Sequence, residues 1–177
     1  WSSVQGSVTC GINTTGRRLL SEELAKMLVG VDGFIAGNDV IDKNALKNAD
    51  NLKVIARYGV GLDNIDLQEA RRRGIVVTNT PGANTASVAE QTITLILALM
   101  RKLPEAVAAT RSGGWPRLHG LSLVDKTVGL LGFGAIGKQV AWRLVGFDCR
   151  LLAYDPYPDH DAARTYGVGL VSRDEVL

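Results

Sequence analysis

The stretch Thr127-Val-Gly-Leu-Leu-Gly-Phe-Gly-Ala-Ile-Gly137 decides the fold of this chain. Residues 128–131 are apolar and predict a buried strand, which runs directly into a turn of the form GxGxxG. A helical pattern over 136–145 and an apolar stretch over 149–154 follow, and Asp155 comes 18 residues after the last glycine. A strand, a glycine turn, a helix and an acid about 20 residues further on together indicate a dinucleotide-binding βαβ unit.

Each part of this motif has a role in the chemistry that we expect, which is the binding of NAD. Gly132 allows the tight turn, Gly134 lets the backbone approach the pyrophosphate, and Gly137 lets the helix pack close to the strand. The helix N-terminus offers free N–H groups and a partial positive charge to the phosphates. Asp155 can accept hydrogen bonds from the adenosine ribose and would repel a 2′-phosphate, and no arginine follows it in 156–159, which favours NAD over NADP. The alternative is a glycine turn that binds nothing.

The composition of the 177 residues is that of one ordinary globular domain or two small ones. Apolar residues make up 46% and charged residues 21%, which excludes disorder, collagen and coiled coil. The net charge of +2 argues against nucleic acid as a partner, and the apolar stretch Leu95–Met100 is too short to cross a membrane. Cys10 and Cys149 fit no metal or disulfide pattern, so we interpret them as buried thiols of a cytoplasmic protein without a metal site.

The residues before the glycine turn alternate between helix and strand patterns, which predicts βαβ units and a parallel sheet. Ser21, Asp42 and Asp66 are each placed to cap a helix, and Glu69 would complete a capping box with the last of them. The predicted strands are 34–36, 52–57 and 75–78. We interpret the run Arg71-Arg72-Arg73 as solvated cations at a helix C-terminus.

A long apolar helix separates this region from the glycine turn. Ser87-Val-Ala-Glu90 predicts a capping box, and 88–103 is apolar on nearly every helical face. Such a helix must be buried on all sides, so we expect it between two domains or against a second subunit, with a homodimer formed through the NAD-binding domain. Beyond Lys126 there is room for one βαβ unit, a strand and the start of a helix. A complete dinucleotide-binding fold needs two βαβαβ halves, so we expect the chain to be part of a longer polypeptide.

Four stretches carry a resemblance to a known family: Arg57-Tyr-Gly-Val-Gly-Leu-Asp-Asn-Ile-Asp66, Gly74-Ile-Val-Val-Thr-Asn-Thr-Pro-Gly82, Asn84-Thr-Ala-Ser-Val-Ala-Glu90, and Gly132 to Asp155. Together they resemble the D-isomer-specific 2-hydroxyacid dehydrogenases, in the phosphoglycerate dehydrogenase-like branch. The resemblance implies an α/β protein with a flavodoxin-like substrate domain over 1–84. An interdomain helix and the first half of a Rossmann NAD-binding domain would follow over 85–177.

The resemblance also implies two sets of site residues. The substrate site would contain Tyr58, Val60, Gly61 and Asn84, with the backbone amides of Val60 and Gly61 on the substrate carboxylate. The cofactor site would contain Gly132, Gly134, Ala135, Ile136, Gly137, Asp155 and Pro156. Exposed N–H groups in a glycine loop form an anion nest, which agrees with the first set, although a plain strand-to-helix turn has the same pattern.

The implied activity is NAD-dependent oxidation of a small D-2-hydroxy acid of the phosphoglycerate, glycerate or glyoxylate type, or reduction of its 2-keto counterpart. The family's catalytic arginine, glutamate and histidine match nothing in this chain, so we assign no catalytic residue and expect no turnover from the chain alone. His119 and His160 are interpreted as surface side chains. The alternative function is that of a non-catalytic, NAD-sensing corepressor-like protein with the same fold.

Overall fold

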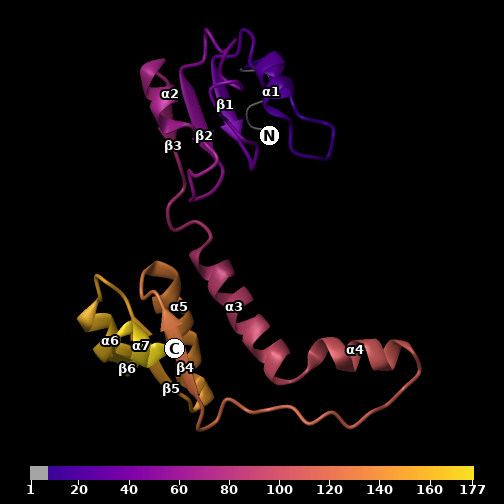
Figure 1. The fold of residues 1–177 in the computed structure, drawn as a ribbon, viewed down its shortest axis with the longest axis vertical. Coiled ribbons are helices and arrows are strands. Elements are labelled where there is room, and N and C mark those ends of the chain that lie inside the picture. Colours follow the sequence, from indigo (N-terminus) through magenta and orange to yellow (C-terminus); the bar gives the residue numbers. More distant parts are fainter. Residues whose placement is uncertain (1–7) are drawn as a thin grey trace. The chain divides into compact units, whose positions relative to one another are not determined.

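The computed structural model describes residues 8–177 and divides into two compact units, the first ending at Ala83 and the second running from Asn84 to Leu177. Each unit contains its own three-stranded parallel sheet (Figure 1). The α/β class predicted from the alternating pattern is therefore confirmed.

The sheet of the first unit has the order β1-β2-β3, with strands Gly33–Ala36, Val54–Arg57 and Val76–Thr78. Helix α1 spans Ser21–Met27 and helix α2 spans Leu67–Arg72. The largest fully buried side chains of this core come from α1, β2 and the loops between them: Leu24, Leu28, Ile41, Leu46 and Ile55. Because all three strands are parallel, their carboxyl ends meet at one edge of the sheet, where the loop after Arg57 begins.

Two helix starts in this unit differ from the sequence-based predictions. Ser21 is the first residue of α1 rather than its cap, and its hydroxyl donates to the Asp42 carboxylate at 2.9 Å. Residues 43–48 form a series of turns instead of a helix. The Asp42 carboxylate does accept the Ala45 N–H at 2.8 Å. The Leu46 N–H donates to the Asp42 carbonyl as in an α-helix, but the Lys47 N–H donates to Asn44, only three residues back, so no regular helix forms.

The predicted capping box at the start of α2 is only half formed. Asp66 accepts the Glu69 N–H at 2.9 Å, as a cap does. The Glu69 carboxylate turns away and accepts from Arg72 and Arg73, each at 2.6 Å. The arginine run does end α2, and Arg71 and Arg72 are exposed cations as predicted. Arg73 differs, because its side chain is only 20% exposed and pairs with Glu69, which is itself 6% exposed.

The second unit has the sheet order β4-β5-β6, with strands Thr127–Leu131, Arg150–Tyr154 and Val168–Leu170. Its helices are α3 (Thr85–Met100), α4 (Leu103–Arg111), α5 (Ala135–Leu144), α6 (His160–Tyr166) and α7 (Arg173–Val176), and the 3₁₀ turn η1 (Val145–Phe147) follows α5. The core includes Phe133, Val140, Ala141, Leu144 and Ala153. The strand–turn–helix–strand order predicted around the glycine turn is confirmed.

Helix α3 begins at Thr85, with Asn84 as its N-terminal flanking residue, so the prediction that Ser87 caps it was wrong. The Ser87 hydroxyl donates back to the Asn84 carbonyl at 3.0 Å. One face of α3 packs on the core of the second unit, through the buried Ala89 and through Ile93, Ile96, Leu97 and Met100. Leu95 and Leu99 are exposed by 53% and 75%, so the all-round burial of this helix stays a prediction.

No helix among residues 8–177 is long and apolar enough to span a membrane. Cys10 is exposed, which corrects its interpretation as a buried thiol. Cys149 is half-buried, and that burial raises the pKa of its thiol.

Candidate functional site

The glycine turn between β4 and α5 is held by backbone bonds and by one apolar anchor. Gly132 has a φ of +105°, which other residues rarely adopt, and its N–H donates to the Tyr154 carbonyl at 2.8 Å. The Phe133 side chain is buried in the core. A Cβ on Gly137 would lie 3.1 Å from the Gly132 carbonyl carbon and closer still to its oxygen, whereas a Cβ on Gly134 would meet nothing within 4 Å.

The first turn of α5 presents unpaired backbone donors. The Lys138 N–H makes the first helical bond, to the Gly134 carbonyl at 3.0 Å, so the N–H groups of Ala135, Ile136 and Gly137 precede it. Ala135 and Ile136 are exposed, and Gly134 beside them leaves open space. These donors, together with the positive end of the helix dipole, suit a phosphate or pyrophosphate group.

Asp155 lies directly after β5, beside this turn, and its carboxylate is fixed by two backbone donors. Tyr157 N–H donates to Oδ1 at 2.8 Å, and Phe133 N–H donates to Oδ2 at 2.7 Å. These bonds, the one from Tyr157 first, hold the pKa of Asp155 below its ordinary value, so the group is charged at neutral pH. Each oxygen keeps a lone pair for a further donor, such as a ribose hydroxyl. Pro156, which follows, is exposed.

The loop after β2 in the first unit is the second predicted site. Tyr58 is 81% exposed, and its N–H donates to the Ala36 carbonyl at 2.9 Å. Gly59 has a φ of +149° and donates to the Thr80 hydroxyl at 3.1 Å. Val60 and Gly61 are both exposed at the carboxyl edge of the sheet. Exposed amides at such an edge can bind the carboxylate of a small acid.

Arg57 is a residue that the sequence analysis did not select for the site. It ends β2, and its guanidinium donates to the Tyr58 carbonyl and, at 2.8 Å, to the Asn38 side chain. Its Nε is buried without a hydrogen-bond partner. A Cβ on Gly59 would lie 2.7 Å from Nη1 of this arginine, so the cation lies directly against the glycine loop. The only signal in the sequence was a charged residue at the end of an apolar strand.

Asn84 begins the second unit and its side chain makes no capping bond to α3, so its amide is free for another partner. The predicted site residues thus fall into two groups. Tyr58, Val60 and Gly61 lie together in one loop of the first unit, and the seven cofactor residues lie together around β4, α5 and β5 of the second.

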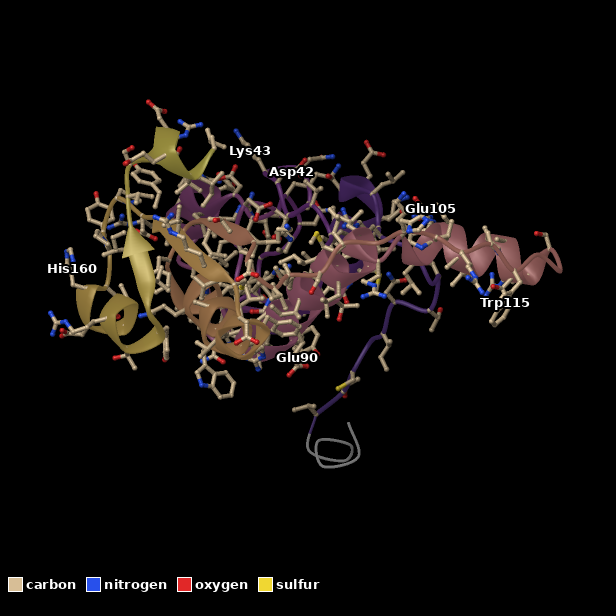
Figure 2. The ribbon with its side chains drawn as sticks, turned by 90° about the horizontal axis from the view of Figure 1, so that it is seen from below. Asp42, Lys43, Glu90, Glu105, Trp115 and His160 are labelled. Carbon is tan, nitrogen blue, oxygen red and sulfur yellow. The ribbon has the colours of Figure 1, made fainter. Side chains whose placement is uncertain are left out.

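The two histidines are surface side chains, as predicted. Both are exposed, and Figure 2 shows the ring of His160 pointing away from the ribbon of α6. Within residues 8–177 neither ring makes a hydrogen bond to a carboxylate, and no group of three or more His, Cys, Asp or Glu side chains is placed to hold a metal ion.

A strand that runs into a GxGxxG turn, a helix with free N-terminal amides and an acid after the next strand form the arrangement that is typical of dinucleotide-binding α/β folds. The family can be named as well. Residues 7–172 match the model of the D-isomer specific 2-hydroxyacid dehydrogenase, catalytic domain, and the chain belongs to that family.

Comparison with individual proteins agrees with this assignment. The chain is 41% identical over 159 residues to the D-3-phosphoglycerate dehydrogenase of Archaeoglobus fulgidus, an alignment that covers 88% of this chain and 30% of the relative. The solved structure of D-lactate dehydrogenase from Escherichia coli superposes with a TM-score of 0.79 at 34% identity, over 87% of this chain and 50% of that one. D-lactate dehydrogenase from Aquifex aeolicus, solved with NAD and lactic acid, has a TM-score of 0.76 at 29% identity, over 86% and 47%. The chain therefore spans about a third of the curated relative and about half of each solved structure.

Proposed function

We propose that this chain is the substrate-carboxylate and NAD-binding part of an oxidoreductase that acts on small D-2-hydroxy acids. The observation that carries the proposal is the arrangement of the second unit, where a fixed, charged Asp155 lies beside the free amides of Ala135 and Ile136. The relative from Aquifex aeolicus, solved with NAD, supports the same choice of cofactor.

The residues present fit NAD. The pyrophosphate would lie over Gly134, which leaves room for it, and would accept from the amides at the start of α5. The ribose hydroxyls would donate to Asp155, and Pro156 would contact the ribose from the following position. When bound, the nicotinamide ring accepts or donates the hydride.

The first unit would hold the acid that is oxidised or reduced. The amides of Val60 and Gly61 would bind its carboxylate, and the exposed ring of Tyr58 would contact the rest of it. Arg57 adds a fixed cation beside the same loop, which supports an anionic substrate of the phosphoglycerate, glycerate or glyoxylate type. In this proposal the residues named above bind and orient the cofactor and the acid, and none of them is assigned a catalytic role.

We further propose that the second unit forms a homodimer and that the protein is cytoplasmic. Four leucines within residues 85–126 are more than half exposed and would be covered in such a dimer: Leu95, Leu99, Leu103 and Leu121. The free thiols of Cys10 and Cys149 suit a reducing compartment.

A fluorescence titration with NADH tests the cofactor site. Gly134→Ala should weaken binding because its methyl group projects where the pyrophosphate would lie, and it should leave the fold intact because nothing lies within 4 Å. Gly146→Ala, whose methyl group also meets nothing within 4 Å but lies in η1, is the matched control and should bind as wild type. Equal NADH affinity in all three proteins would contradict the proposed site.

A second assay tests the division of labour between binding and chemistry. Protein consisting of residues 1–177, verified by mass, should not oxidise NADH with glyoxylate or hydroxypyruvate, because a positioned acid or base contributes about 10²–10⁴-fold to such a rate. Turnover at an ordinary enzymatic rate that His119→Ala or His160→Ala abolishes would show that a histidine of this chain is catalytic.

A further inference from the structure

An ion pair involves a residue that lies four positions after Asp155, the aspartate that is proposed to bind the ribose. Lys138, in the first turns of α5, donates from Nζ to Oδ2 of Asp159 at 2.8 Å. Both side chains are partly exposed, by 33% and 40%, so the pair is within reach of a ligand. Lys138 lies on α5, the helix that follows the glycine turn, and Asp159 is the capping residue directly before α6.

The ammonium of Lys138 interacts with the charges of two acids, Asp159 and Asp155, and forms a hydrogen bond with Asp159. Its direct partner is Asp159, and the pKa of Lys138 is raised first by that hydrogen bond. Asp155 is close enough for the charge of Lys138 to contribute to the lowering of its pKa, although the bonds from Tyr157 and Phe133 contribute more. Tyr166 is the remaining titratable group whose charge acts on the ammonium.

This arrangement determines which charge an incoming cofactor meets. The carboxylate of Asp155 is fixed at the ribose position with a full negative charge. Lys138 is a cation that could neutralise a phosphate on the ribose 2′-oxygen, but its charge is compensated by Asp159. A lysine on a four-carbon stem is mobile enough to turn to a new anion once its partner is removed.

We propose that Asp159 is a specificity-determining residue, which holds Lys138 away from the ribose position and thereby excludes the 2′-phosphate of NADP. The proposal rests on the proposed binding of NAD in this unit, and it adds a second acid to the one that the glycine motif identifies. Asp155 repels the extra phosphate directly, and Asp159 removes the cation that would attract it.

The side chain of Asp159 has a second role that the test must preserve. Its Oδ1 accepts the Ala162 N–H at 3.0 Å and caps α6. Asparagine caps helices about as well as aspartate, so Asp159→Asn removes the charge and keeps the cap. Lys138→Met removes the ammonium and keeps an unbranched, helix-compatible side chain.

The experiment compares the affinities of the purified protein for NADH and NADPH by fluorescence titration, in wild type, Asp159→Asn, Lys138→Met and the double variant. We expect Asp159→Asn to shift the NADPH-to-NADH affinity ratio towards NADPH by about tenfold, because a freed ammonium can pair with the phosphate. The double variant should lose this gain, since the cation responsible is gone. Asp32→Asn breaks the Lys53–Asp32 pair, which has the same 2.8 Å length but lies in the first unit, and should leave the ratio unchanged.

Three results would overturn the inference: an unchanged ratio in Asp159→Asn at a wild-type melting temperature, a gain that survives in the double variant, or an equal gain in Asp32→Asn. A wild type that binds neither dinucleotide would instead overturn the proposed function, and with it the specificity role. Binding of NADH alone by wild type, with the predicted gain in Asp159→Asn, supports both.

Discussion

Replacing Gly137 by alanine should destabilise the second unit, because the added methyl group has no space. Its Cβ would lie 3.1 Å from the carbonyl carbon of Gly132 and closer still to the oxygen. Both partners are backbone, so the clash is relieved only by moving the turn or the helix. Overpacking of this kind costs about 1–3 kcal/mol, and a rigid backbone contact belongs in the upper half of that range.

A helix-propensity gain offsets part of this cost. Gly137 lies within α5, where alanine is more favourable than glycine by up to about 1 kcal/mol. The net destabilisation is then about 1–2 kcal/mol, and each kcal/mol lowers the Tm of a unit of this size by roughly 4–8 °C. The displaced turn would also misplace the amides of Ala135 and Ile136, and losing one charge-assisted hydrogen bond weakens NADH binding about tenfold or more.

Thermal melts followed by circular dichroism, together with NADH titrations, measure both effects. Gly146→Ala is the control, since the same methyl group is added where nothing lies within 4 Å. Its Tm should equal or slightly exceed that of wild type. If Gly137→Ala melts and binds NADH as wild type does, then the close approach of α5 to the turn is not what shapes this site.

Three further predictions concern cofactor choice, pH dependence and assembly. Asp155→Ala should weaken NADH binding and reduce the preference for NADH over NADPH in fluorescence titrations. A wild type that prefers NADPH would refute the assignment of NAD as the cofactor. The pKa of Glu69 is held at about 2, below its usual 4.5, by hydrogen bonds from two arginines, so its contribution to stability is complete above pH 4.5 and is lost as the pH falls towards 2. Urea midpoints between pH 5 and pH 2 should therefore fall more steeply in wild type than in Glu69→Gln, and parallel curves would exclude this role. Leu99→Lys should shift the protein from dimer to monomer in analytical ultracentrifugation, whereas an unchanged sedimentation profile would place the dimer interface elsewhere.

The elements that the sequence predicted best are those set by patterns along the chain. Strand β4, the glycine turn and α5 follow one another within residues 127–144, so the local sequence, and its glycines above all, is enough to predict them. The parallel strands of the first unit also follow from short apolar stretches separated by helical or turn-forming segments.

Helix starts were predicted less well, because several residues in a row can satisfy the same capping pattern. Ser87 with Glu90 fits a capping box, yet α3 begins three residues earlier than that box predicts, and Glu90 pairs with Arg143 on α5 at 3.3 Å. Glu69 likewise contacts two arginines instead of closing its box. In both cases an arginine competes with the backbone N–H of the cap for the same carboxylate. That arginine lies on another helix for Glu90 and at the end of the same helix for Glu69, and the sequence alone does not rank these partners.

The candidate site likewise contains residues that a sequence motif identifies and residues whose contacts only the folded structure shows. The glycine motif identifies where free amides occur, because the need for a tight turn and close packing leaves a visible glycine pattern. Asp155 is visible for a similar reason, since it follows the next strand at a typical spacing. Arg57 and the pair of Lys138 with Asp159 carry no such pattern, because their contacts form between segments that only the fold brings together.

This difference matters for function because backbone amides are common to all residues and distinguish poorly between related ligands. The N–H groups at the start of α5 would donate equally well to the pyrophosphate of NAD and of NADP, since that group is identical in the two cofactors. Discrimination must therefore come from charges near the ribose, where the cofactors differ by one phosphate. In the proposed complex the fixed carboxylate of Asp155 would repel that phosphate, and the pairing of Lys138 with Asp159 would leave no free ammonium to attract it, so two acids and one lysine would together determine the choice.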